Sequence, residues 1–321
     1  MASSNGLGHA RRLLSLATGL SKIVDGVSLA ITSKQKELLQ SEIESIHKSS
    51  KLSVIEIGNH GLEPTIFLSR TAEDSVSKET QQALISADAV LSDNSLWPAK
   101  FNPHFFLFGH FDWITYVDSL PNEVGHLVRE SQIYQLEKNL REKALGWFKT
   151  KDFAIHNQFL ESVALEVPFI RYENDKKFSE TRGESAWFSM GTTGRNMDDF
   201  SRMRILGKRL IRKESWNMTN SPTLPTAVLG RPGFGTIRDC LASATPFFSV
   251  WKGSDPELSS NELKMNKLGL SRNHTSTSLN AIDPSTLKSI SSEMKKYWSS
   301  SSATQDQVAF KVKTHIVREL K

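Results

Sequence analysis

The chain has 321 residues, a formal net charge of +5, 38% hydrophobic residues and a single cysteine, Cys240. This length predicts two domains, and one cysteine excludes an intrachain disulfide and is typical of a reducing compartment. No apolar run approaches the roughly 20 residues that span a bilayer. We therefore expect a cytoplasmic protein without a nucleic-acid partner, whose charge is compatible with peripheral contact with the inner face of a membrane.

The first half of the chain alternates helical and strand-like segments. A tight Gly-rich loop at residues 6–8 precedes a helix at residues 11–20. Short apolar runs typical of buried parallel strands occupy residues 26–32, 52–57, 89–91 and 105–111. Helical spacing marks residues 34–49 and 77–86 and a long charged amphipathic segment at 123–148. Strands that alternate with helices predict βαβ units around a parallel sheet.

A polar stretch at residues 173–184 is the predicted linker, and a second alternating series follows it. Strands are expected at residues 186–190, 226–229 and 246–251, and helices at 197–206, 237–244 and in two pieces after residue 284. The basic run at 208–213 is typical of a solvated helix face. We predict an α/β fold with two Rossmann-like domains, residues 1–178 and 179–321, and an interdomain cleft.

Three predicted strand-to-helix junctions carry glycine and small hydroxyl residues: 5–9, 191–194 and 230–236. Ligands collect at the carboxyl ends of parallel strands, where helix N-termini offer free N–H groups to phosphate. The third junction, Gly-Arg-Pro-Gly-Phe-Gly-Thr, is the strongest because Asp239 follows one helical turn later. Its carboxylate could accept hydrogen bonds from ribose hydroxyls, or could simply stabilise the first turn of a helix.

The segment 229–242, together with Thr245-Pro246 and residues 255–261, resembles the C-terminal donor-binding domain of GT-B glycosyltransferases. Within that fold it is most similar to family 28, the lipid-linked peptidoglycan N-acetylglucosaminyltransferase type. Residues 6–12 are similar to the N-terminal Gly-x-Gly-His loop of this superfamily and to the UDP-sugar hydrolase of pseudaminic acid synthesis. The chain departs from the family in having only four residues in place of a hydrophobic first strand, and in a second domain that is short by about one βα unit.

The resemblance implies an inverting, metal-independent glycosyltransferase that moves a sugar from a nucleotide sugar, expected to be a UDP-sugar, to an acceptor. The N-terminal domain would then take the acceptor and the C-terminal domain the donor. Asp239 would bind ribose, Glu257 the hydroxyls of the donor sugar, and Asn261 would support the loop. The full set of expected donor-binding residues is Gly191, Thr192, Arg231, Gly233, Phe234, Gly235, Thr236, Asp239, Glu257 and Asn261.

Sugar transfer with inversion needs a general base that titrates near neutral pH, and His9 has the suitable side chain. Asp93, after an apolar strand, could orient the acceptor or act as an alternative base, or could be an N-cap. His110 sits among aromatic residues that are either core or a platform for the acceptor. No Asp-x-Asp motif or His/Cys cluster has metal-ligand spacing, so helix N-termini and Arg231 would replace a cation.

Two other functions fit the same residues. Water could replace the acceptor, which would make the protein a nucleotide-sugar hydrolase. The short start before the Gly-rich loop also suggests a non-catalytic relative that binds sugar nucleotides. No cofactor is expected beyond the nucleotide-sugar co-substrate, and the acceptor could be a glycan, a lipid-linked group or a small molecule.

Overall fold

The chain is described from a computed structural model, which covers residues 7–47, 51–57, 76–172, 175, 182–183, 185–189, 204–205, 208–212, 223–250, 253, 255–273 and 282–321. It forms two compact units, one of residues 1–170 with 303–321 and one of residues 171–302. The division between the units therefore falls eight residues before the expected 178/179 boundary. Gly191, Thr192 and most of the expected linker and of the helix at 197–206 lie outside the described residues.

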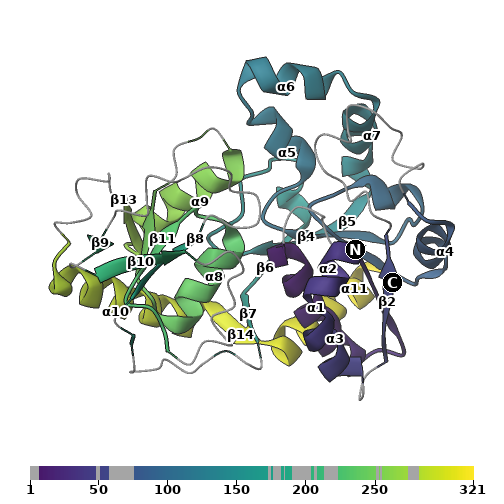
Figure 1. The fold of residues 1–321 in the computed structure, drawn as a ribbon. Coiled ribbons are helices and arrows are strands. Elements are labelled where there is room, and N and C mark those ends of the chain that lie inside the picture. The colour runs from purple at the N-terminus through teal and green to yellow at the C-terminus, as the bar shows by residue number, and fades with distance from the viewer. Residues whose placement is uncertain are drawn as a thin grey trace. The chain divides into compact units, whose positions relative to one another are not determined.

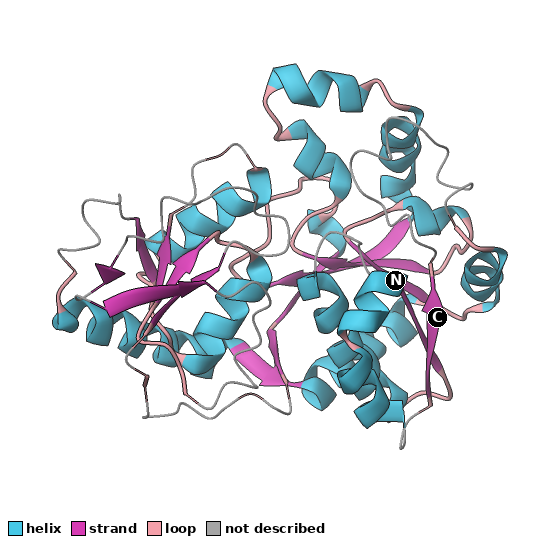
Figure 2. Cartoon of the chain, in the orientation of Figure 1, coloured by secondary structure: helices cyan, strands magenta, loops and turns pink. Residues whose placement is uncertain are grey.

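The first unit contains two parallel sheets among its described residues (Figure 2). A four-stranded sheet has the order β3-β4-β5-β6, and a two-stranded sheet pairs β1 with β2. All five residues of β4 are buried, as expected for a strand of a parallel sheet covered on both faces. The strands are β1 (Val27–Ile31), β2 (Leu52–Glu56), β3 (Val90–Asp93), β4 (Phe105–Gly109), β5 (Ala144–Thr150) and β6 (Ala164–Val167).

The helices of the first unit include the last one of the chain, α11 (Gln305–Glu319), which lies beside α1 (Leu7–Ser21) (Figure 1). The two helices pack closely because Gly19 has no side chain. A Cβ atom at this position would lie 2.7 Å from the carbonyl oxygen of Gln305 and 2.9 Å from the Cβ of Ala309. The other helices of this unit are α2 (Ser33–Leu38), α3 (Gln40–His47), α4 (Lys78–Ser86), α5 (Trp113–Asp118), α6 (Asn122–Arg129) and α7 (Gln132–Leu140), with short 3-10 turns η3 (Trp97–Lys100), η4 (Arg141–Lys143) and η5 (Glu161–Val163).

The prediction of one long helix at residues 123–148 is wrong. The segment forms α6, α7, η4 and most of β5. Ser131 ends the first helix and caps the second, since its hydroxyl accepts a hydrogen bond from the backbone N–H of Tyr134 at 3.2 Å. Trp147 and Phe148 are fully buried in β5, so sheet packing and not helical periodicity decides the conformation there.

The described residues of the second unit form a six-stranded sheet with the order β13-β12-β11-β8-β10-β9, and among these strands only β9 is antiparallel to its neighbour. Its strands are β8 (Ala186–Ser189), β9 (Arg204–Ile205), β10 (Lys208–Arg212), β11 (Val228–Gly230), β12 (Phe247–Ser249) and β13 (Ser271–Asn273), and its helices are α8 (Phe234–Ser243), α9 (Pro256–Lys267) and α10 (Pro284–Ser301). The chain crosses between the units at β7 (Phe169–Arg171) and β14 (Ser302–Thr304), which form a two-stranded sheet of their own.

Two expectations for the second unit are wrong. The basic run at 208–213 is not a helix face, because residues 208–212 form β10 and pair with β8 in parallel and with β9 in antiparallel orientation. The end of the expected helix at 197–206 is likewise a strand, β9. Cys240 is a fully buried thiol on α8, and burial raises its pKa, as expected for a packed side chain and not for a nucleophile.

Candidate active site and donor loop

The first cluster of functional side chains lies at the carboxyl ends of β3 and β4. Asp93 is the last residue of β3, Gly109 is the last residue of β4, and the two strands are neighbours in the sheet. Asn94 follows Asp93 with φ of 63°, a left-handed conformation that asparagine tolerates. Gly109 has φ of 150°, and a Cβ there would lie 2.1 Å from Oδ1 of Asn94. Glycine is therefore required at 109 so that the two strand ends can meet.

His9 joins this cluster from the first turn of α1. The helix begins at Leu7, so His9 is helical and does not lie on the expected loop. Its Nδ1 is 3.1 Å from Oδ2 of Asp93, and the Asp93 side chain is fully buried. A carboxylate can only accept a hydrogen bond, so a proton on Nδ1 would satisfy this contact and would leave the lone pair of Nε2 to accept another proton. The structure thus brings together the two residues that the sequence singled out for catalysis.

Arg12 completes the cluster, and the sequence reasoning gave it no role. It lies one turn after His9 on the same face of α1, which is the signal that could have indicated it. Its Nη2 is 2.5 Å from Oδ1 of Asp93, and its Nη1 is 2.8 Å from Nδ1 of His110. Burial raises the pKa of Asp93, but the guanidinium of Arg12 and the ring of His9 outweigh this effect and hold the pKa well below its usual value. The Asp93 carboxylate therefore lies between Arg12 and His9, in contact with both.

His110 follows β4 and is buried with the aromatic residues around it. Its ring lies 6.2 Å from the ring of His9 and 5.7 Å from the ring of Phe111. Phe111 and Trp113 are also buried, and both belong to the core of this unit. The aromatic residues after β4 are therefore core, and among the described residues they do not form an exposed platform for an acceptor.

A buried carboxyl group, Glu137 of α7, supports the turn that follows Asp93. Its Oε1 accepts hydrogen bonds from the hydroxyl of Ser95 at 2.5 Å and from the backbone N–H of Trp97 at 3.2 Å. Burial, and to a smaller degree the nearby Asp112, raise the pKa of Glu137 to about 7, against the hydrogen bonds that lower it. At neutral pH this side chain is therefore partly protonated.

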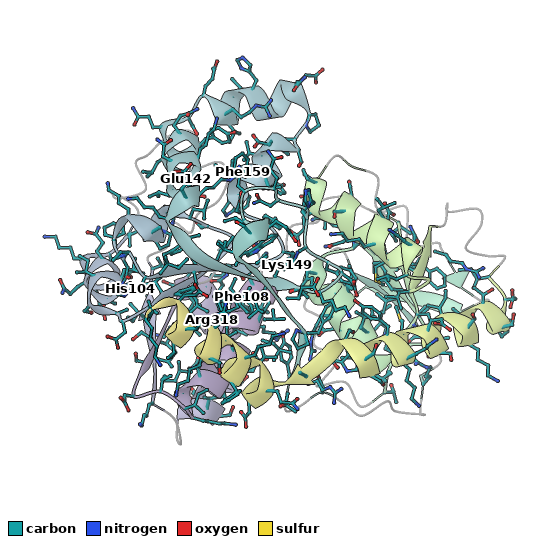
Figure 3. The ribbon with its side chains drawn as sticks, turned by 180° about the vertical axis from the view of Figure 1, so that it is seen from behind. His104, Phe108, Glu142, Lys149, Phe159 and Arg318 are labelled. Carbon is teal, nitrogen blue, oxygen red and sulfur yellow. The ribbon has the colours of Figure 1, made fainter. Side chains whose placement is uncertain are left out.

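Glu137 predicts a pH dependence of stability. Its folded-state pKa is above its ordinary value of 4.5, so its contribution is fully present below that value and is lost as the pH rises through about 7. Between pH 5 and 8 the wild-type protein should lose free energy of unfolding relative to Glu137→Gln, by on the order of 3 kcal/mol. Urea unfolding at a series of pH values measures this loss. Exposed Glu142, labelled in Figure 3, provides the control Glu142→Gln, which should keep the wild-type dependence.

The second candidate site is the loop between β11 and α8 in the second unit. Gly233 is the N-cap of α8, its backbone is extended, and no side chain caps the helix. A glycine at the N-cap offers no side chain to the N–H groups of the first turn, from Phe234 to Thr236, as in many phosphate sites at helix N-termini. A Cβ added at Gly233 would meet no described atom within 4 Å, so this position has room for a small side chain.

Two of the predicted donor residues contact this loop or its helix. The buried Asn261 of α9 donates a hydrogen bond from Nδ2 to the carbonyl oxygen of Pro232 at 3.0 Å and so fixes the loop against α9. Asp239 accepts a hydrogen bond from Nη1 of Arg238 at 2.9 Å, and Arg238 also contacts Asp175. Because α8 begins at residue 234, Asp239 lies in its second turn, and the alternative of a first-turn carboxylate is wrong.

The remaining donor residues are placed as follows. Glu257 is in the first turn of α9 and is partly exposed, after Asp255 whose carboxylate caps the helix. Arg231 is partly buried at the start of the loop.

Among the described residues, no group of three or more His, Cys, Asp or Glu side chains is arranged to hold a metal ion. In the same part of the chain, no helix has the length and apolar character needed to cross a membrane.

Comparison with known proteins identifies the fold. The chain matches no protein-family model and no curated protein sequence. Among solved structures it is similar to Phytolacca americana UGT2 complexed with UDP-2-fluoro-glucose and pterostilbene, with 13% identity, a TM-score of 0.63 and 98% of each chain covered. It is also similar to the glycosyltransferase SnogD from Streptomyces nogalater, with 15% identity, a TM-score of 0.57 and 98% of each chain covered.

A third similar structure is LpCGTa in complex with UDP, with 10% identity and a TM-score of 0.63, covering 98% of this chain and 97% of that one. At these identities the likeness concerns the fold alone. It confirms the prediction of two Rossmann-like units with the GT-B fold. It does not distinguish family 28 from other families that share this fold.

Proposed function

We propose that the protein transfers a sugar from a UDP-sugar to an acceptor hydroxyl with inversion, without a metal ion, and with His9 as the general base. The observation that carries this proposal is the contact between His9 and the buried Asp93 at the carboxyl ends of β3 and β4. The GT-B fold supports it, and so do structural neighbours that include the glycosyltransferase SnogD and LpCGTa in complex with UDP.

In this reaction Nε2 of His9 takes the proton from the acceptor hydroxyl. The acceptor oxygen forms a bond to the anomeric carbon of the donor while the bond from that carbon to UDP breaks on the opposite face. The imidazolium that forms is stabilised by Asp93, which accepts the hydrogen bond from Nδ1. UDP leaves with an additional negative charge, and the N–H groups at the N-terminus of α8, together with Arg231, are the proposed groups that stabilise it.

The donor half of the proposal is tested by Gly233→Val. The backbone of Gly233 has φ of −67° and ψ of 142°, which valine adopts readily, and the position has open space, so the variant should fold. The added side chain should block the approach of the diphosphate and weaken UDP binding by about 1.5–3 kcal/mol, the range for hydrogen bonds to a charged group. Isothermal titration calorimetry with UDP measures the change.

Gly26→Val is the matched control, because Gly26 also has no atom within 4 Å of an added Cβ and lies in the other unit. Equal UDP affinity for Gly233→Val and the wild-type protein would remove this loop from the donor site. The same preparations then separate the alternatives. Release of UDP from a UDP-sugar without any acceptor indicates the hydrolase, and binding without turnover indicates a non-catalytic relative.

A further inference from the structure

Arg12 is the most highly connected side chain of the first cluster. It is buried, with a side chain 6% exposed, and it contacts the ends of two strands. Nη2 reaches Oδ1 of Asp93, Nη1 reaches Nδ1 of His110, and the guanidinium carbon lies 5.4 Å from the ring centroid of Phe108, which is labelled in Figure 3. Both terminal nitrogens are therefore held by groups from β3 or from the residue after β4.

This arrangement divides the carboxylate of Asp93 between two partners. Oδ1 accepts from Arg12, and Oδ2 is left to accept from His9. Nη2 of Arg12 and Nδ2 of Asn94 also approach Nδ1 of His9, each at 3.4 Å. These N–H donors would favour the opposite tautomer, in which Nδ1 is a lone-pair acceptor. The orientation of the carboxylate therefore decides which nitrogen of His9 carries the proton.

We propose that Arg12 is a positioning residue, which holds the Asp93 carboxylate so that Oδ2 faces His9 and keeps the reactive tautomer of that ring. Its positive charge also offsets the negative charge that Asp93 presents to His9. The charged and titratable groups that face His9 among the described residues are Arg12 from its own helix, Asp93 from β3 and His110 after β4. Asp112, two residues further on, is held instead by Arg141 and Asn157.

The tautomer is tested directly by imidazole ¹⁵N NMR, with the His9 signals assigned by their loss in His9→Ala. In the wild-type protein Nδ1 should be protonated and Nε2 should be the acceptor. Arg12→Gln should give a mixture of tautomers, because the carboxylate is free to rotate. Arg11→Gln is the matched control: the neighbouring Arg11 pairs with Glu42 outside the cluster, so its loss should leave the His9 signals unchanged. An unchanged tautomer in folded Arg12→Gln overturns the proposal.

Kinetics supply a second readout, which rests on the proposed function. Arg12→Gln should lower kcat roughly 10²-fold, the cost of a misplaced catalytic group. The KM for the UDP-sugar should stay unchanged. Arg12→Lys keeps the charge and should recover part of kcat.

If Arg12→Gln does not fold, Arg12→Lys carries the test alone, since one ammonium group cannot reproduce both contacts of the guanidinium. A wild-type tautomer and a wild-type kcat in Arg12→Lys then overturn the proposal, whereas a mixed tautomer with a lower kcat supports it. If the wild-type protein transfers no sugar, the proposed function fails. The NMR comparison still decides the role of Arg12, because it needs no substrate.

Discussion

Replacing His9 by alanine should lower turnover of a UDP-sugar about 10²–10⁴-fold, the usual contribution of general acid–base catalysis. The ring of His9 is held at 3.1 Å by the buried Asp93, and in the variant the acceptor hydroxyl has no positioned group to take its proton. The affinity for UDP should change little, because the proposed nucleotide loop is in the other unit. Initial rates at saturating donor, with UDP affinity measured separately by calorimetry, distinguish the two effects.

His126→Ala is a suitable control for this experiment. His126 lies on α6 with an exposed side chain, so its removal should leave both the rate and the fold unchanged. Equal rates for wild type and a folded His9→Ala protein would exclude His9 as the base.

Asp93→Asn should destabilise the protein by about 3–5 kcal/mol, the range for removing one partner of a buried ion pair. Asp93 is fully buried, and the substitution leaves the guanidinium of Arg12 in the core without its counter-ion. Denaturant unfolding followed by circular dichroism measures the loss. Asp25→Asn is the matched control, because Asp25 is exposed and pairs with Lys51 at 3.7 Å, so little stability depends on it.

The pH dependence and a double variant sharpen this prediction. The pKa of Asp93 is lower in the folded protein than its ordinary value of 3.8. The stability that its charge contributes is therefore present at pH values above 3.8 and is lost as the pH falls toward the folded-state pKa. In acid, the difference in free energy of unfolding between the wild-type protein and Asp93→Asn should therefore shrink.

The double variant Arg12→Gln/Asp93→Asn should be destabilised by less than the sum of the losses in the two single variants. Strict additivity would show that the ion pair does not couple the two residues.

The sequence by itself determined the strands and the loop on which the two candidate sites are built. The apolar runs at 89–91 and 226–229 predicted β3 and β11, and the glycine-rich segment 230–236 predicted the loop before the next helix. Such features are local, because short buried strands and glycine-containing turns leave their pattern in consecutive residues. The rule that carboxyl ends of parallel strands converge pointed to Asp93. His9 was selected for its imidazole and because residues 6–12 resemble the Gly-x-Gly-His loop of GT-B glycosyltransferases.

Only the tertiary structure decided which residues meet at those ends and which segments become strands. Arg12 contacts Asp93 and His110, which are 81 and 98 positions away in the chain, and no local periodicity contains that information. Residues 144–150 and 208–212 have patterns that a helix could also accommodate, and they are strands because neighbouring strands supply their backbone hydrogen bonds. In the same way, α11 belongs to the first unit because Gly19 of α1 leaves room for it, a contact between the two ends of the chain.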